Sequence, residues 1–186
     1  MNREFLFRGV KRADTEKGQL QEYAEILSGS SVNVWAAINA IYGQKNVEVY
    51  ALTDLAEKQA LQNMARDLGM ESLTALSYLD KAPMAVLDLH NNQSFGCKGQ
   101  IIDAKRDELS TLVTKGGPED LRICTGVRLD EVDIVKKFLN ASKPGFRSVG
   151  LKPDVLQNKE ALEKILSSVD YLFINHDEDA MMSQNF

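Results

Sequence analysis

The sequence predicts a three-layer α/β domain with a mostly parallel sheet and a small β lid. First, β-rich runs alternate with stretches whose apolar residues recur at helical spacing, which is typical of parallel strands covered by helices on both faces. Second, two segments, at about residues 20–27 and 84–105, have extended patterns without helix signals, and we assign them to the lid. Third, no repeat, low-complexity tract or linker divides the chain, so we expect one domain over residues 1–186.

The first half of the chain contains helix, strand and helix in that order. The first helix shows its apolar stripe at Val34, Ala37, Ile38 and Ile41. Gly43 follows this stripe and suits the end of a helix. Residues 47–52 form a β-rich run, and Asp54 and Glu57 then have the spacing of a capping box before a second helix over 61–68. We expect Asp54 to cap this turn.

The second half repeats the alternation. Three β-rich runs lie at 121–124, 148–151 and 171–174, with helical patterns over 129–139 and 162–169 between them. We expect these three runs to join the strand near residue 47 in the main sheet. In the lid, residues 84–90 alternate as a strand exposed on one face would, and Gly96 and Gly99 interrupt the extended run that follows.

Composition excludes several classes of partner. The chain has 186 residues, 44% hydrophobic and 26% charged, as expected of a globular protein. Its net charge of -5 and the lack of long basic clusters argue against nucleic acid. Cys97 and Cys124 lie far apart without a CxxC partner, which favours a reducing cytosol. No run approaches the roughly 20 apolar residues of a membrane span, and no signal-peptide core follows Arg3, so we expect a cytoplasmic protein with no membrane partner.

Two polar motifs are candidate binding sites. Gly29, in the turn Ser28-Gly29-Ser30-Ser31 before the first helix, lets the backbone approach a polyol closely, and the Asn33 amide can donate to and accept from sugar hydroxyls. At the carboxyl end of the last strand, Glu178 offers a hard oxygen that can hold Mg²⁺ through water, and Asn175 helps to order that shell. Because parallel sheets collect ligands at their carboxyl edges, we expect the Asn33 turn, Asp54, Lys152 and Asn175 at such edges.

Each motif also has a purely structural interpretation. Ser-Gly-Ser-Ser before a helix is often only a loop and N-cap, and Asn-His-Asp-Glu after a strand can simply begin a helix whose dipole favours acidic residues. Trp35 is expected to pack in the core. His90 and His176 lack companion ligands and are expected to face solvent.

The order of these motifs resembles that of ribokinase-like (PfkB-type) carbohydrate and nucleoside kinases over residues 18–186. The segment 28–43 is similar to the family's amino-terminal signature, a strand, acidic turn and helix follow at 47–68, and Asn175 with Glu178 matches its Asn-x-x-Glu motif. The resemblance implies an incomplete ribokinase-like, Rossmann-like fold. It also implies phosphoryl transfer from ATP with Mg²⁺ to a hydroxyl of a sugar or nucleoside, substrate binding at Gly29 and Asn33, metal binding at Glu178 and Asn175, and lid-mediated dimers.

The sequence departs from the family pattern in three places. One glycine of the usual pair is Ser28, no clear counterpart of the family's first strand is found in residues 1–18, and the Gly-Ala-Gly-Asp motif with its anion hole and aspartate base is absent. No catalytic residue is therefore identified, because nothing favours Asp130, Asp154 or Asp170 geometrically. We expect the nucleotide site to be largely missing, the domain to be truncated at its carboxyl end, and the chain to be inactive by itself.

Three functional hypotheses remain. The chain is the substrate-side portion of a sugar or nucleoside kinase, or a degenerate, non-catalytic kinase-like module that associates with itself or a protein partner, or an unrelated Rossmann-like nucleotide-binding enzyme. The absence of GxGxxG and GxxxxGK[ST] counts against the third. For the second, a sheet that stops at residue 174 would leave an edge for a partner to cover, so we expect a homodimer or a complex.

Overall fold

The computed structural model describes residues 2–11, 18–43, 47–89, 93–106, 108, 117–141 and 144–183. The chain divides into two compact units, unit 1 (Met1–Gln100) and unit 2 (Ile101–Phe186). Each unit contains its own cluster of buried apolar side chains. Among the described residues, no helix is long and apolar enough to cross a membrane.

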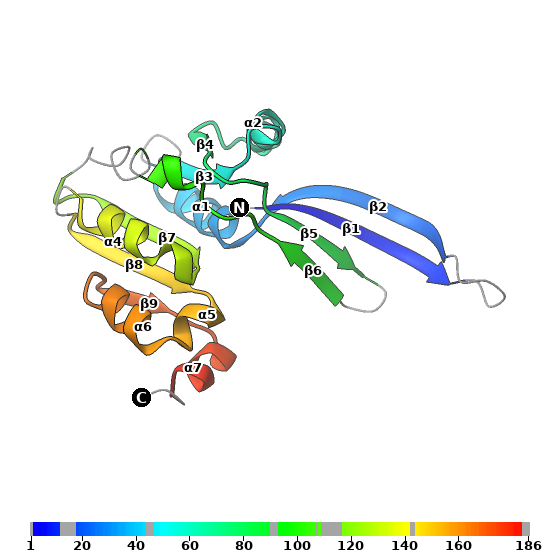
Figure 1. Cartoon of the computed structure of the whole chain (residues 1–186). Helices are drawn as coiled ribbons and strands as arrows, with labels where there is room; N and C mark the ends of the chain where they lie inside the picture. The colour runs from blue at the N-terminus through cyan, green and yellow to red at the C-terminus, as the bar shows by residue number, and fades with distance from the viewer. Residues whose placement is uncertain are drawn as a thin grey trace. The chain divides into compact units, whose positions relative to one another are not determined.

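Unit 1 contains a four-stranded sheet in the order β2-β1-β5-β6, visible in Figure 1. Its strands are β1 (Asn2–Lys11), β2 (Gly18–Ser28), β5 (Met84–Asp88) and β6 (Gln93–Cys97). β1 runs antiparallel to β2 and parallel to β5, and β5 runs antiparallel to β6. Strands therefore occur where the sequence indicates extended segments, and a short 3-10 turn, η2 (Asp103–Lys105), follows at the start of unit 2.

Strand β1 corrects the expectation that residues 1–18 contain no first strand. Its sequence alternates poorly, because Phe5, Leu6 and Phe7 are consecutive apolar residues flanked by charges. Such a run is ambiguous from periodicity alone. In the structure, β1 pairs with β2 on one side and with β5 on the other, and these pairings identify it as a strand although its sequence pattern does not.

The remainder of unit 1 is a helix-covered pair of parallel strands. Its elements are α1 (Ser30–Tyr42), β3 (Val49–Thr53), α2 (Lys58–Asp67) and β4 (Leu73–Ser77). β3 pairs in parallel with β4, a strand that the sequence analysis did not identify. Trp35 packs in this core as expected, together with Leu27, Val49, Ala51, Leu61, Ala65, Met70, Leu73 and Ala75.

Asp54 joins two segments of unit 1 that are distant in sequence. Its Oδ1 accepts a hydrogen bond from the Glu57 backbone N–H (2.7 Å), and its Oδ2 accepts one from the Ala82 N–H (2.9 Å). Asp54 is a cap, as expected, although the capped turn precedes α2, whose own N-cap residue is Glu57. Both carboxylate oxygens are therefore bonded to backbone amides.

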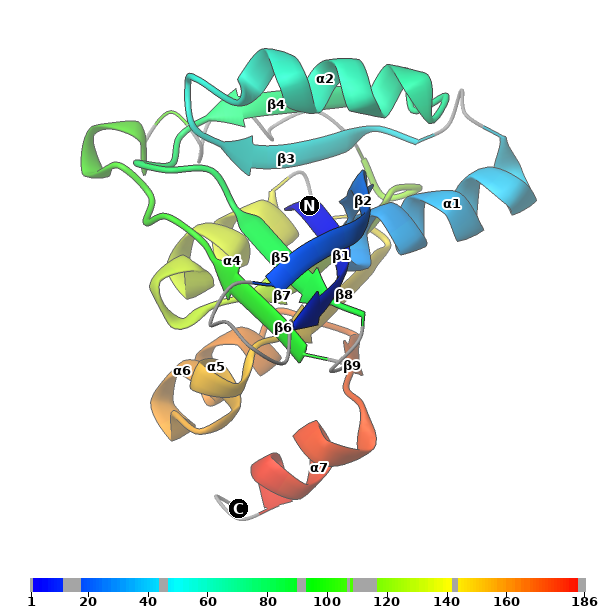
Figure 2. The ribbon, with the colours of Figure 1, turned by 90° about the vertical axis from the view of Figure 1, so that its right-hand side faces the viewer.

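Unit 2 is a parallel three-stranded sheet, β7 (Leu121–Val127), β8 (Phe146–Leu151) and β9 (Tyr171–Phe173), in that order. Its helices are η3 (Leu129–Glu131), α4 (Val132–Asn140), α5 (Pro153–Leu156), α6 (Lys159–Leu166) and α7 (His176–Ser183). Figures 1 and 2 show α4, α5 and α6 on one face of this sheet. Val149 and Leu151 of β8 pack against them, with Leu162 and Ile165 fully buried in α6.

These strand and helix assignments confirm the predicted fold class. The three β-rich runs of the second half are parallel strands with helices between them, and the run near residue 47 is a parallel strand of unit 1. The hydrogen-bonded pairs described group β3 with β4 and, separately, β7 with β8 and β9.

Candidate functional site

The turn between β2 and α1 brings Gly29 and Asn33 together. Gly29 has φ 103°, in the region that favours glycine, and it is the N-cap residue of α1. Its carbonyl oxygen accepts hydrogen bonds from the N–H groups of Val32 (2.9 Å) and Asn33 (3.4 Å). The Asn33 side chain is exposed in the first turns of the helix. The turn therefore holds Asn33 at the surface beside a backbone segment without a side chain.

Two buried polar atoms belong to residues on either side of this turn. Ser28 Oγ and Trp35 Nε1 have no hydrogen-bond partner among the described residues. A buried donor without a partner costs about 1–3 kcal/mol, so such groups call for an explanation. The sequence analysis treated Trp35 only as a core residue, since its indole N–H could not be placed from the pattern.

Asn175 and Glu178 form a reciprocal cap at the start of α7. The Glu178 backbone N–H donates to Asn175 Oδ1, and the Asn175 N–H donates to Glu178 Oε2, both at 2.9 Å. This geometry matches the structural interpretation of the motif as a helix start. It still leaves a carboxylate, partly exposed, at the carboxyl end of β9.

The described residues include no group of three or more His, Cys, Asp or Glu side chains suited to a metal ion. Mg²⁺ usually keeps several waters and needs only one or two carboxylates, so a single glutamate is compatible with water-mediated binding. His176 is exposed, as expected, and His90 lies outside the described residues.

The three candidate aspartates of unit 2 all have structural partners. Asp130 binds the Arg128 guanidinium (2.8 Å), and Asp154 accepts hydrogen bonds from the N–H groups of Leu129 and Val155 (3.0 Å each). Asp170 binds Arg147, and the hydrogen bond from that guanidinium holds the pKa of Asp170 below its ordinary value. Each of the three carboxylates therefore already has a bonding partner within unit 2.

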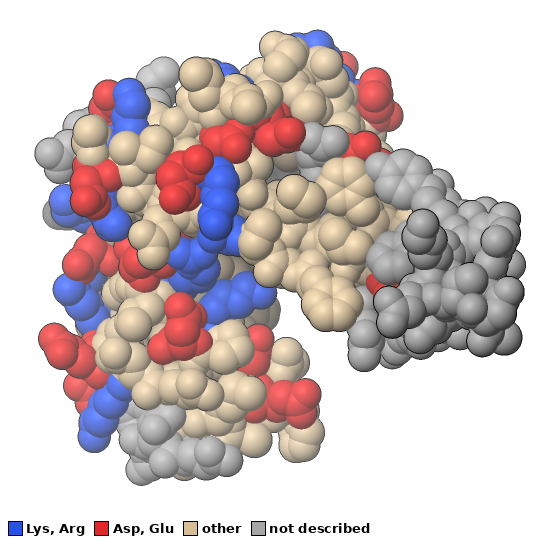
Figure 3. All heavy atoms as spheres, turned by 45° about the vertical axis from the view of Figure 1, so that its right-hand side comes forward, with Lys and Arg blue, Asp and Glu red and all other residues tan. Residues whose placement is uncertain are grey.

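The carboxyl ends of the unit 2 strands place polar side chains side by side. Arg128 and Lys152 follow the paired residues Val127 and Leu151, and the Lys152 N–H donates to the Val127 carbonyl (2.8 Å). Asn175 lies two residues beyond Phe173, which pairs with Gly150. On the face drawn in Figure 3, basic and acidic side chains are interspersed.

No protein-family model and no curated protein matches this sequence. Solved structures do. A mutant of phosphofructokinase-2 from Escherichia coli matches 98% of this chain and 61% of its own, with a TM-score of 0.68 and 13% identity. A nucleoside kinase from Methanocaldococcus jannaschii, an archaeal member of the ribokinase family, matches 100% of this chain and 62% of its own (TM-score 0.65, 18% identity). A Burkholderia thailandensis nucleoside kinase in complex with inosine matches 98% and 60% (TM-score 0.64, 14% identity).

These comparisons define the class of fold. The chain has the ribokinase-like fold of sugar and nucleoside kinases, which confirms the resemblance found in the sequence. At identities of 18% or less, the likeness is one of fold. The chain spans about three fifths of the length of the kinases that it matches, as the covered shares of 60–62% show.

Proposed function

We propose that this chain is the substrate-side portion of an ATP-dependent kinase that transfers a phosphoryl group to a hydroxyl of a sugar or nucleoside. The observation that carries the proposal is the match of nearly the whole chain to part of several sugar and nucleoside kinases. Phosphoryl transfer depends mostly on positioning and charge stabilisation. A portion that only binds the acceptor would therefore contribute to catalysis by positioning the acceptor hydroxyl.

The proposed acceptor site is the turn at Gly29 and Asn33. The exposed Asn33 amide offers one acceptor and two donors, which suits vicinal hydroxyls, while Gly29 adds no side chain to obstruct them. The unpartnered Ser28 Oγ and Trp35 Nε1 support a polar ligand or water near this turn.

Glu178 and Asn175 are the residues proposed to hold Mg²⁺ through water. Bound Mg²⁺ would neutralise charge on the transferred phosphate. Glu178 Oε2 already accepts from the Asn175 N–H, and this bond fixes the orientation of the carboxylate. The same cap fixes the orientation of the Asn175 amide.

A binding experiment tests the acceptor site. Titration calorimetry against a panel of pentoses, hexoses and nucleosides measures binding directly. We expect at least one of these ligands to bind saturably, and Asn33→Ala to weaken that binding about tenfold through lost hydrogen bonds. Asn39→Ala, on the same helix, is the matched control. Equal binding by both variants would contradict the proposed site.

A coupled ATP-consumption assay tests the catalytic half of the proposal. We expect no turnover from the chain alone, since losing a positioned base costs about 10²- to 10⁴-fold and losing oriented nucleotide binding costs more. In a longer polypeptide that supplies the nucleotide half, Glu178→Gln should lower kcat sharply. Ordinary turnover by the repurified 186-residue chain would refute the assignment of a substrate-side portion.

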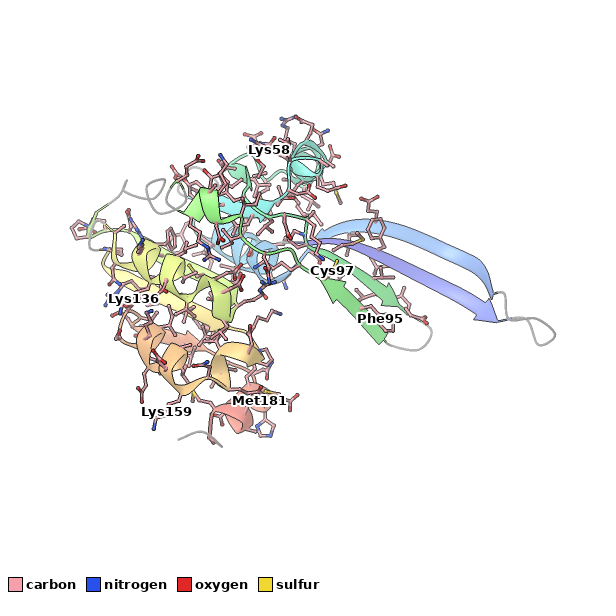
Figure 4. The ribbon with its side chains drawn as sticks, viewed as in Figure 1. Lys58, Phe95, Cys97, Lys136, Lys159 and Met181 are labelled. Atoms are coloured by element: carbon pink, nitrogen blue, oxygen red, sulfur yellow. The ribbon has the colours of Figure 1, made fainter. Side chains whose placement is uncertain are left out.

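The second candidate function is an interaction module, and the exposed four-stranded sheet favours it. Backbone pairing places Phe5, Val86 and Phe95 in one row, so they share a face, and Phe95 is 61% exposed. Figure 4 shows Phe95 and Cys97 on β6. An exposed apolar sheet face of this kind suits a second copy of the chain, with the two sheets acting as paired lids. One of the matched phosphofructokinase-2 structures is described as a tetrameric inhibited form.

Light scattering at micromolar concentration tests this association. We expect a species larger than 20.7 kDa, and Phe95→Glu should shift it to the monomer because a charge would be buried in the interface. Leu55→Glu, at an exposed position outside the four-stranded sheet, is the control. A monodisperse monomer of the unaltered chain would exclude the homodimer. We also propose a cytoplasmic location, in keeping with the two free cysteines.

A further inference from the structure

The helices of unit 2 cover one face of its sheet and leave aromatic side chains exposed on the other. Val149 and Leu151 of β8 pack in the core with α4, α5 and α6, and Leu172 of β9 packs against the same core. Because side chains alternate along a strand, Tyr171 and Phe173 point to the opposite face. They are 57% and 59% exposed. Parallel sheets are normally covered on both faces, so this aromatic surface calls for a partner.

A stacked pair of rings orders this surface. The ring centroids of Phe146 and Tyr171 lie 4.8 Å apart, and their planes differ by 26°. Phe146 lies two residues before Ser148, the ladder partner of Tyr171, so the two rings share a face. A Cβ at Gly150, the ladder partner of Phe173, would have only backbone atoms within 4 Å, the nearest being Phe173 O at 3.7 Å. No described side chain therefore lies over Gly150 beside the Phe173 ring.

Strand β9 is also the outer strand of this sheet, as Figure 1 shows. It pairs with β8 on one side, and no described strand pairs with its other side. Helix α7, which follows β9 in the chain, packs against α5. Because backbone N–H and C=O groups point alternately to the two sides of a strand, the outer side of β9 offers donors and acceptors to a further strand.

The outer edge of β9 carries no charge. Residues 171–175 are uncharged, and Asp170, which precedes them, is bound to Arg147. The strand at the other end of the order, β7, contains a buried charge at Arg122 and a register shift, and both features protect sheet edges. An uncharged edge has nothing to select a charged partner strand, whereas two identical uncharged edges approach each other without repulsion. The charge pattern therefore favours a second copy of the chain.

We propose that β9 pairs antiparallel with β9 of a second copy, about a twofold axis at Leu172. In this register, Tyr171 of each copy lies opposite Phe173 of the other. A twofold axis perpendicular to the sheets keeps corresponding faces on the same side, so both aromatic pairs lie on the exposed face. Aromatic pairs across antiparallel strands are stabilising. The two three-stranded sheets then form one continuous sheet.

The size of this contact sets its strength. An aromatic side chain buries roughly 150–250 Å² in full, so the exposed 57% and 59% of Tyr171 and Phe173 offer about 200 Å² per copy. A standard interface buries about 800 Å² per partner. Strand β9 has three residues, so its backbone adds few hydrogen bonds. We therefore expect a weak dimer whose population depends on protein concentration.

Sedimentation equilibrium of the Phe95→Glu variant tests this contact apart from the pairing of the four-stranded sheets. We expect a monomer at micromolar concentration and a species of twice 20.7 kDa as the concentration approaches millimolar. Adding Phe173→Glu should weaken this dimer about tenfold or more, because a charge from each copy would enter the contact. Adding Leu121→Glu is the matched control. Leu121 is 56% exposed on β7, at the opposite edge of the same sheet, and its change should leave the dimer within about twofold.

Amide hydrogen exchange supplies a second measurement that needs no change in β9. As the concentration of the Phe95→Glu variant rises, the amides of β9 should gain protection while those of β7 keep theirs. A monomer at every concentration, equal losses from Phe173→Glu and Leu121→Glu, or equal gains of protection in β7 and β9 would overturn the proposal. These outcomes do not depend on sugar binding at Asn33, so failure of the proposed acceptor site and failure of this contact are separate results.

Discussion

Replacing Gly99 by alanine should destabilise unit 1 through a backbone clash. Gly99 is buried, and a Cβ there would meet Asp80 Oδ1 and the backbone of Lys81, with Lys81 N at 2.6 Å. These neighbours cannot move freely, because the Asp80 N–H donates to the Gln100 carbonyl (3.0 Å) and the Gln100 N–H donates to Asp80 Oδ1 (2.7 Å). The substitution must strain or break this pair of hydrogen bonds.

The expected magnitude follows from these contacts. Loss of two hydrogen bonds at about 1 kcal/mol each, with about 1–3 kcal/mol of overpacking strain, gives about 3–5 kcal/mol. Gly96→Ala is the matched control in the same unit, since its Cβ would meet the Met84 carbonyl at an ordinary 3.5 Å. It should change stability by less than about 1 kcal/mol.

Urea unfolding followed by the fluorescence of Trp35 measures both variants, because this tryptophan lies in the core of unit 1. We expect the midpoint of Gly99→Ala to fall well below that of Gly96→Ala, with an unchanged slope. Equal midpoints for the two variants would refute the argument that the chain at Gly99 passes too close to residues 80 and 81 for a side chain.

Three further predictions concern other parts of the molecule. A thiol reagent at pH 8 should modify the exposed Cys97 rapidly and Cys124 far more slowly, since burial, with a smaller contribution from a nearby glutamate, raises the pKa of Cys124 to about 12. Two equally fast thiols would contradict this. The pKa of Asp170 is lowered by its bonds to Arg147, so its stabilising contribution is present at neutral pH and is lost as the pH falls through the folded pKa. The free energy of unfolding of Asp170→Asn should therefore depend less on pH in the acid range than that of the unaltered chain. Identical pH dependence of the two proteins would refute the linkage. Asn175→Ala should destabilise α7 by about 1 kcal/mol, measured as faster amide exchange at Glu178, and unchanged exchange would contradict the cap.

The sequence predicted the elements with strong periodicity. The strands near 47, 121, 148 and 171 were found because β-branched and apolar residues cluster there between clear helical stripes. β4 was missed because Leu73–Ser77 has a single β-branched residue, Thr74, among leucine, alanine and serine, so its strand signal is weak and pairing with β3 is what makes it a strand.

The candidate site was predicted in part. The order of motifs indicated the fold, and the spacing of Asn175 and Glu178 indicated either a helix cap or a metal-binding site. The hydrogen bonds between these two residues show the cap, and the metal-binding role stays a prediction. The register shift between β7 and β8 at Thr125 and Gly126 could not be foreseen, because it depends on the partner strand.

The bond between Asp54 and Ala82 has a consequence for how unit 1 opens. It closes a loop of 28 residues that contains α2 and β4, so one carboxylate joins the beginning of this segment to its end. Lengthening a loop adds only slowly to the entropic cost of closing it, which means that a single well-placed bond can couple its two ends. The turn before α2 and the approach to β5 should therefore behave as one cooperative unit of local unfolding, in which protection from solvent is gained or lost at both ends together.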